Sequence, residues 1–198
     1  MMGTALILAA MSLFLYNQMD SLRAEQSAAA VMEQLVDRVP LSEADDPIQY
    51  PALEIPEALI DPSKNKMAEV EIDGHTYIGY LSVPALGLEL PVMADWSYTK
   101  LKLAPCRYAG TVGGGDLVLM AHNYARHFGG LSELAEEDRV LFTDMEGIVT
   151  CYEVVGMDIL APTAVEEMVA GDFDLTLFTC TYGGQSRVRV YCNRVKDR

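Results

Sequence analysis

A cysteine and an arginine stand at the ends of two apolar runs in this sequence, where together they could carry out acyl transfer. Cys180 ends the apolar run 175–180, and Arg187 opens the alternating run 187–195 after a short polar turn. If the two runs form a hairpin, both side chains lie at its mouth. A cationic neighbour stabilises a thiolate and can hold a developing oxyanion, so the pair could supply a nucleophile and its electrostatic partner.

The proton donor that such chemistry needs is best supplied by His122. It follows the buried apolar run 116–121, and a strand end presents a side chain rigidly. His127 in the loop that follows is the alternative base, whereas His75 belongs to a surface hairpin. Cys180, His122 and Arg187 are therefore predicted to be nucleophile, general acid/base and oxyanion or substrate clamp.

Each of these residues also has a structural interpretation. A free cysteine at a strand end is ordinarily a small buried hydrophobic group, and a histidine there can bond to a backbone carbonyl. Arg189 lies on the same face of its strand as Arg187 and is the alternative clamp. Cys106, Cys151 and Cys192 are interpreted as structural, with disulfide pairing left open.

Composition excludes several classes of function. The chain has 29 acidic and 14 basic residues and a formal net charge of −15, so no nucleic-acid partner is expected. It lacks CxxC, HExxH and GxxxxGK[ST] motifs, which leaves the common zinc, metalloprotease and P-loop interpretations without support. Glu136, Glu137 and Asp138 could meet a Ca²⁺ ion, but a solvated helix end is the favoured interpretation, and no cofactor is expected.

The elements that must position these residues are mostly short strands. Only two short helices are expected, one over 131–136 and one that begins at Thr163, where Thr163 and Glu166 form a capping box. This pattern predicts an all-β barrel or sandwich. Strands are predicted over residues 70–72, 75–83, 86–93, 116–121, 148–155, 175–180 and 187–195.

The N-terminal third differs in character. Residues 2–16 are apolar and uncharged, although shorter than the ~20 residues that cross a bilayer comfortably. A membrane anchor is the preferred interpretation, with a cleaved signal peptide and a buried core helix as alternatives. Residues 17–38 predict a juxtamembrane helix, and the proline-rich acidic stretch 40–66 predicts an extended linker.

From residue 72 to 195 the chain resembles the sortases, the cysteine transpeptidases of Gram-positive bacterial surfaces. The resemblance lies in Thr176, Leu177, Thr179 and Cys180 of TLFTC, in the Arg-initiated strand RVRVYCNR, and in Ala121-His122 upstream. It implies a closed eight-stranded β-barrel with a few short helices and a Cys–His–Arg site. The domains expected are an anchor over 1–18, a helix and linker over 19–66, and a catalytic barrel over 67–198.

The resemblance also implies a function and a location. The chain would cleave an L-P-x-T-G-like sorting signal of surface proteins through a Cys180 thioester, without a cofactor. It would then transfer the acyl group to an amine of a peptidoglycan precursor or a pilin. A single-pass anchor would place the catalytic domain outside the cell membrane. The alternatives are a cysteine protease that only hydrolyses and a membrane-tethered peptide-binding barrel without turnover; the sortase subclass stays open.

Overall fold

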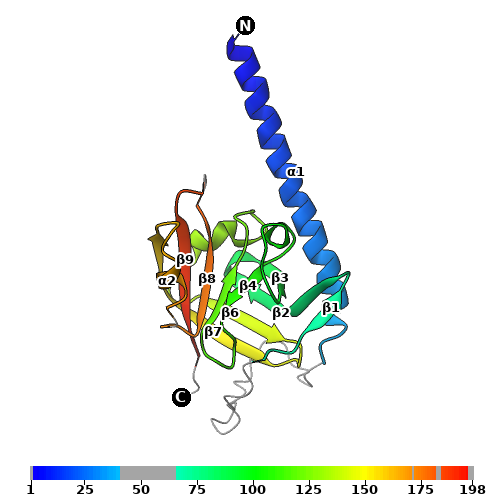
Figure 1. Ribbon diagram of the computed structural model, residues 1–198, viewed down its shortest axis with the longest axis vertical. Helices are drawn as coiled ribbons and strands as arrows, with labels where there is room; N and C mark the ends of the chain where they lie inside the picture. Colours follow the sequence, from blue (N-terminus) through cyan, green and yellow to red (C-terminus); the bar gives the residue numbers. More distant parts are fainter. Residues whose placement is uncertain (1, 41–65, 171, 182–183, 196–198) are drawn as a thin grey trace.

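Nine strands form the body of the protein in the computed structural model, which describes residues 2–40, 66–170, 172–181 and 184–195 (Figure 1). The strands are β1 (Val70–Ile72), β2 (His75–Val83), β3 (Leu88–Met93), β4 (Cys106–Ala109), β5 (Leu117–Met120), β6 (Arg139–Asp144), β7 (Val149–Leu160), β8 (Leu175–Cys180) and β9 (Arg187–Arg194).

Eight of these strands close into a barrel. The sheet runs in the order β2-β3-β4-β5-β8-β9-β7-β6, and β6 pairs again with β2, so the ring has no free edge. β1 is a ninth strand, joined to β2 by a turn in which Asp73 and Gly74 have φ of 51° and 77°. Glycine reaches this left-handed region at little cost, which is why Asp-Gly favours a tight hairpin. The closed eight-stranded barrel expected from the resemblance is thus confirmed.

The barrel interior is filled by side chains from every second position of its strands. Ile78, Leu119, Phe142, Leu177 and Val190 come from five different strands and are fully buried in one cluster. Burial of such apolar side chains is the main favourable contribution to folding. The packed interior therefore leaves the ends and the outer face of the barrel for chemistry.

The structure differs from the sequence-based prediction in two additional strands, in the end of β7, which runs to Leu160 rather than to residue 155, and in one helix cap. β4 and β6 were not predicted, and the helix expected over 131–136 is the 3₁₀ helix η5, Phe128–Glu133. The helix expected at Thr163 is α2, Val165–Met168. Its N-cap is Ala164, without a side-chain cap hydrogen bond, so the capping box predicted there was wrong. Two more short helices, η3 (Pro84–Leu86) and η4 (Lys100–Lys102), are present, so the expectation of only two was wrong.

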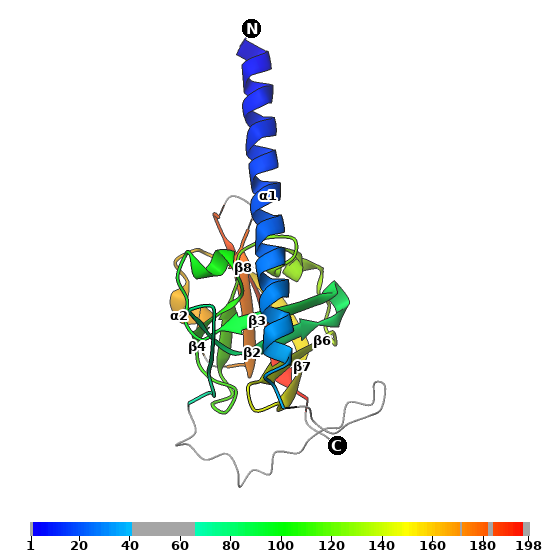
Figure 2. The same cartoon turned by 90° about the vertical axis from the view of Figure 1, so that its right-hand side faces the viewer.

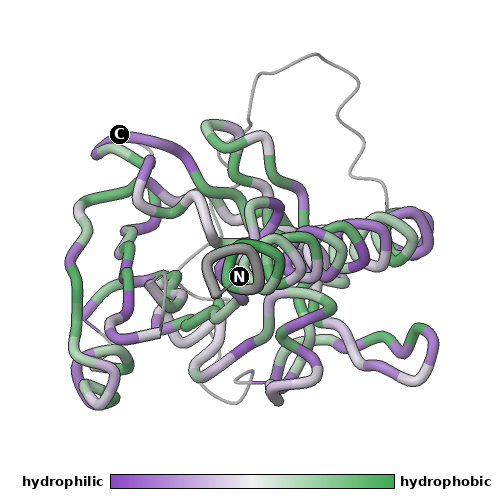
Figure 3. The backbone as a smooth tube through the Cα atoms, turned by 90° about the horizontal axis from the view of Figure 1, so that it is seen from above, coloured by the Kyte–Doolittle hydropathy of each residue, from purple (hydrophilic) through white to green (hydrophobic). Residues whose placement is uncertain are grey.

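The N-terminal segment is a single continuous helix, α1 (Met2–Val36), rather than two segments. Its second half lies against the barrel, with Ala24, Ala28 and Leu35 buried at helical spacing. Its first half extends beyond the barrel (Figures 1 and 2). The large hydrophobic side chains from Leu6 to Tyr16 are exposed. Seen from above, the turns nearest the N-terminus are the most uniformly hydrophobic part of the helix (Figure 3).

Across the described parts of the chain, no helix combines the length and the hydropathy that a bilayer crossing requires. The anchor expected over residues 1–18 therefore stays a prediction. Most of the expected linker, residues 41–65, lies outside the described residues.

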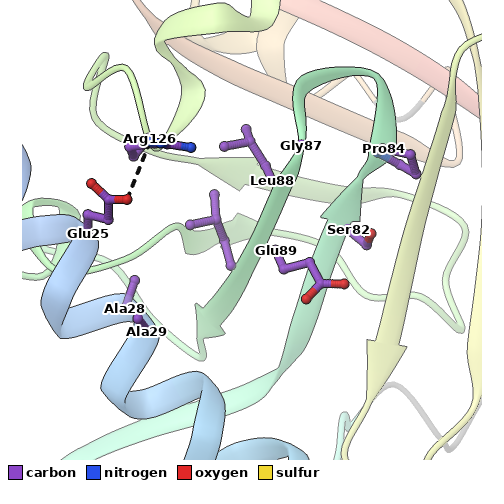
Figure 4. A pocket seen from close by; sticks show the side chains of 10 residues that line it. Glu25, Ala28, Ala29, Ser82, Pro84, Gly87, Leu88, Glu89 and Arg126 are labelled. Atoms are coloured by element: carbon purple, nitrogen blue, oxygen red, sulfur yellow. Dashed lines mark ion pairs between the residues drawn. The ribbon is translucent and has the colours of Figure 1, made fainter.

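Helix α1 does not pack against the barrel along its whole length. A pocket of about 570 Å³ lies between α1 and the β2–β3 hairpin and is bordered by Glu25, Ala28, Leu88, Glu89 and Arg126 (Figure 4). The Glu25 and Arg126 side chains meet across one side of it, 3.4 Å apart. α1 is held by the fully buried Leu35, which packs in a cluster with Ile72 and Tyr77, and by polar pairs such as this one.

Candidate active site

Parallel pairing of β5 with β8 brings His122 next to Cys180. The register ends at Met120 opposite Phe178, and the pairing continues because the Ala121 N–H donates to the Phe178 carbonyl over 3.3 Å. The Thr179 hydroxyl then donates to the Ala121 carbonyl over 2.9 Å. His122 and Cys180 are the next residues in these two neighbouring segments, so they lie at the same end of the barrel.

Antiparallel pairing of β8 with β9 brings Arg187 to the same place. Cys180 and Arg187 are directly opposite each other in the register, and such cross-strand neighbours have adjacent side chains. Cys180 is exposed because it ends β8, whereas the five residues before it in the strand are all buried. The Arg187 guanidinium donates to the carbonyl oxygens of Gly184 (3.1 Å) and Ser186 (3.0 Å), which holds it at the mouth of the hairpin.

Arg189, the alternative clamp, has a structural partner instead. Its guanidinium donates to both carboxylate oxygens of Asp158 on β7, at 3.0 and 2.6 Å. The two residues are also opposite each other in the β7–β9 register. This bidentate pair occupies the Arg189 side chain away from Cys180, so the geometry favours Arg187 as the cation beside the thiol.

Two contacts restrain the His122 ring, a hydrogen bond in the ring plane and an aromatic ring stacked on its face. Its Nδ1 lies 3.0 Å from Oδ1 of Asn123, and the Tyr124 ring stacks on it with centroids 4.1 Å apart and planes 10° apart. Burial lowers the pKa of His122, an effect that the hydrogen bond to Asn123 opposes. Because an amide oxygen only accepts, it selects Nδ1–H and leaves Nε2 for proton transfer.

His127, the alternative base, is fully buried. Among the described residues neither of its ring nitrogens has a hydrogen-bond partner. Burial, followed by the nearby His122, lowers the pKa of His127 to about 4. A neutral imidazole without access to solvent is poorly suited to exchange protons with a substrate, so the geometry favours His122.

The other three thiols lie in a different environment, and all four cysteines are free. Cys106 and Cys192 are buried, and burial raises the pKa of each to about 12. Burial also raises the pKa of Cys151, which is partly exposed. Since the thiolate is the reactive form, Cys180 is the exposed candidate nucleophile.

Three aromatic rings contact one another in a row that begins on β8. Phe178 precedes Cys180 by one alternation of β8, and its ring meets Tyr108 edge-on at 5.2 Å. Trp96 extends the row at 5.6 Å from Tyr108 and is 39% exposed. We call Trp96, Tyr108 and Phe178 the aromatic row; Phe178 on β8 is buried at 2% exposure, so the exposed part of the row is its far end at Trp96.

No metal site emerges in the described part of the chain, where groups of three or more potential ligands are absent. Among the acids considered for Ca²⁺, Glu136 and Glu137 are exposed, and the Asp138 carboxylate accepts a 2.8 Å hydrogen bond from the Ala135 N–H. That bond is an ordinary turn contact.

Sequence reasoning missed two residues at this end of the barrel, Tyr124 and Asp20. The Tyr124 hydroxyl donates to the Asp20 carboxylate on α1 over 2.6 Å, across 104 positions of sequence. Burial and this bond raise the pKa of Tyr124. No periodicity or motif links positions so far apart, so only the folded chain reveals the contact.

Comparison with known proteins adds an independent line of evidence. The family model described as "Sortase domain" matches residues 81–195, more than half of the chain. Sortase A of Bacillus anthracis is 27% identical over 125 residues, which make up 60% of this chain but only 59% of that relative. The alignment therefore leaves about two fifths of the relative unmatched.

Two solved structures of similar fold are both sortases of the C type. Sortase C1 of Streptococcus suis is 31% identical, with a TM-score of 0.55 over 62% of this chain and 74% of that one. Sortase C of Clostridium perfringens, solved with a C-terminal cell wall sorting motif, is 25% identical, with a TM-score of 0.55 over 67% and 75%.

Proposed function

This chain belongs to the sortase family, and from that premise we propose that it is a cysteine transpeptidase with Cys180, His122 and Arg187 as its catalytic residues. The observation that carries the proposal is the register of β5, β8 and β9. It brings a histidine, an exposed thiol and a guanidinium to one end of the barrel, on three neighbouring strands or strand ends. These are the groups that acyl transfer through a thioester requires.

The proposed reaction has two halves. The Cys180 thiolate attacks the carbonyl carbon of the scissile peptide bond, and Arg187 stabilises the oxyanion that forms. The carbon–nitrogen bond breaks as His122 gives the proton on Nε2 to the leaving amine, which leaves a thioester. An incoming amine attacks the thioester and loses its proton to His122, and the Cys180 thiolate leaves. Both protonation states are restored, so no cofactor is needed.

The proposed substrate is a sorting-signal peptide of the L-P-x-T-G type. The C. perfringens relative was solved with a C-terminal cell wall sorting motif, which supports a peptide of this class. The exposed Trp96 end of the aromatic row offers an apolar surface that part of an extended peptide could contact. The proposed acceptor is an amine of a peptidoglycan precursor or a pilin.

The full chain tests the proposal when it is incubated with L-P-x-T-G-like peptides, with and without amine acceptors. Mass spectrometry should detect an acyl adduct on Cys180 and a ligated product that forms only with the amine. Cys180→Ala should give neither and is the matched control. Hydrolysed peptide without ligation would point to a protease instead, and peptide binding without cleavage would point to a binding barrel.

We further propose that the exposed apolar start of α1 holds the chain at the cell membrane, with the barrel outside the cell. Leu6, Ile7, Leu8, Leu13 and Phe14 are each more than half exposed, and such an array is unfavourable in water. The full chain should sediment with membranes after expression, whereas a variant with these five residues changed to Ser should not. Recovery of the unchanged chain in the soluble fraction would contradict this proposal.

A further inference from the structure

A three-residue contact joins the N-terminal helix to the proposed general acid/base. Tyr124 stacks on the His122 imidazole at 4.1 Å, and its hydroxyl donates to the Asp20 carboxylate at 2.6 Å. Asp20 also lies 3.8 Å from the Lys102 ammonium, and its side chain is only 23% exposed. The contact is therefore a partly buried, charge-assisted hydrogen bond between α1 and the loop that follows β5.

The loop that carries Tyr124 is itself closed tightly. The Tyr124 carbonyl accepts hydrogen bonds from the backbone N–H groups of His127 and Gly129, each at 2.9 Å. A Cβ at Gly129 would lie 2.7 Å from the carbonyl oxygens of Asn123 and Tyr124, so only glycine fits this approach. The backbone of Tyr124 is thus fixed by its own loop, while its side chain is fixed by Asp20.

Together these contacts restrain the imidazole in two directions. The hydrogen bond to Asn123 acts in the plane of the His122 ring and sets its tautomer. The Tyr124 ring, only 10° from parallel, limits tilting out of that plane. A general acid must keep its nitrogen within hydrogen-bond reach of the leaving group, so such restraint bears directly on rate.

We propose that Tyr124 is a positioning residue for His122, and that Asp20 on α1 holds Tyr124 in its stacked position. The inference rests on the proposed role of His122 in acyl transfer. It makes α1 a working part of the catalytic end of the barrel rather than a tether alone. The buried Ala24 and Ala28 support this arrangement, because they seat α1 on the barrel just after Asp20.

Steady-state kinetics of the full chain test the proposal through Tyr124→Phe and Asp20→Ala. Both remove the hydrogen bond between Tyr124 and Asp20, and Asp20→Ala also removes the longer contact with Lys102; each should lower kcat by about tenfold, the rate equivalent of one charge-assisted bond. KM should change by less than about twofold, since substrate binding is untouched. The double variant should be no slower than either single one, because the two changes remove one shared interaction.

Two further variants separate positioning from general damage. Tyr124→Leu also removes the stack and should lower kcat by on the order of 100-fold, with Tyr124→Phe restoring part of the loss. Glu25→Ala breaks the neighbouring ion pair of α1 with Arg126 and should leave kcat unchanged. Equal losses in Glu25→Ala and Asp20→Ala, or independent effects of Asp20→Ala and Tyr124→Phe, would overturn the proposal.

Nuclear magnetic resonance gives a readout that does not depend on turnover. Stacking shifts the ring proton resonances of His122 upfield, so Tyr124→Leu should abolish this shift and Asp20→Ala should reduce it. Glu25→Ala should leave the resonances in place. An unshifted His122 in the unchanged chain would refute the positioning role, whereas a shifted ring in a chain without ligation or hydrolysis would refute only the proposed function.

Discussion

Among single side chains, Cys180 differs from the other three thiols in exposure. Cys106 and Cys192 are buried with a raised pKa, whereas Cys180 is exposed opposite Arg187. We expect a limiting dose of an alkylating reagent to label Cys180 first and to abolish turnover in proportion. Peptide mapping by mass spectrometry measures the order of labelling.

The matched variants for this prediction are Cys180→Ala and His122→Ala. The first should fold and bind peptide but form no acyl-enzyme. The second should be nearly inactive while Cys180 is still alkylated, since loss of the proton donor leaves the thiol in place. An acyl adduct on Cys106, Cys151 or Cys192 would contradict the assignment of the nucleophile.

The two arginines of β9 should differ in what they affect. Arg187→Ala should lower the rate of acyl transfer by on the order of 10²–10³, as loss of one oxyanion donor typically does. Arg189→Ala should mainly lower the free energy of unfolding, by about 1.5–3 kcal/mol, because it leaves Asp158 without its bidentate partner. Kinetics and chemical denaturation of both variants test this; an inactive, stable Arg189→Ala would reverse the assignment.

At the scale of elements, the closure of the barrel depends on close approach of β2 and β6 at Gly79. This residue has φ of 144°, and a Cβ there would collide with the Thr143 carbonyl oxygen. Gly79→Ala should therefore lower the free energy of unfolding by about 2–5 kcal/mol, through strain and displacement of β6. Chemical denaturation measures the loss.

Gly74→Ala is the matched control for this prediction. Gly74 has φ of 77° but open space around its Cβ position, so only the left-handed backbone penalty of about 1 kcal/mol applies. Equal losses in the two variants would show that barrel closure does not depend on the glycine contact.

The elements that sequence predicted best are those with clear alternation or clear turn residues. β8 matched the prediction, and β9 differed by one residue at its end, because the turn between them is short and polar. β6 was missed because its apolar stretch, Val140 to Phe142, is only three residues long and is flanked by charged and polar residues. β4 was missed because it is only four residues long.

The sequence suggested Cys180, His122 and Arg187 because each follows, ends or opens an apolar run, and the structure places all three at strand ends. The division of α1 into two segments rested on polarity, although residues 4–39 contain neither glycine nor proline to end a helix. Tyr124 and Asp20 could not be predicted. Their contact arises from how α1 docks on the barrel, and no local pattern encodes that docking.

At the scale of the whole molecule, His127 should make stability depend on pH. Burial lowers the pKa of His127 from 6.5 to about 4. Between these values the unfolded chain binds a proton that the folded chain does not, so the free energy of unfolding falls as pH drops. We expect this residue to account for about 3 kcal/mol between pH 7 and pH 4.

The comparison of the unchanged chain with His127→Leu isolates this contribution, because all other titrating groups are common to both. Urea denaturation at several pH values should show a shallower loss of stability in the variant as pH falls. Parallel curves for the two proteins would mean that His127 already takes up its proton in the folded state.

Because α1 is one continuous helix, the position of a residue along it sets how far that residue lies from the catalytic end of the barrel. A helix rises about 1.5 Å per residue, so Asp20 lies roughly 6 Å below Tyr16, the last residue of the apolar run. The tips of β8 and β9 point toward the same end (Figure 1). With the apolar run seated in lipid, Cys180 would work almost at the headgroup plane. A substrate itself attached to the bilayer would then meet the thiol by lateral diffusion in two dimensions.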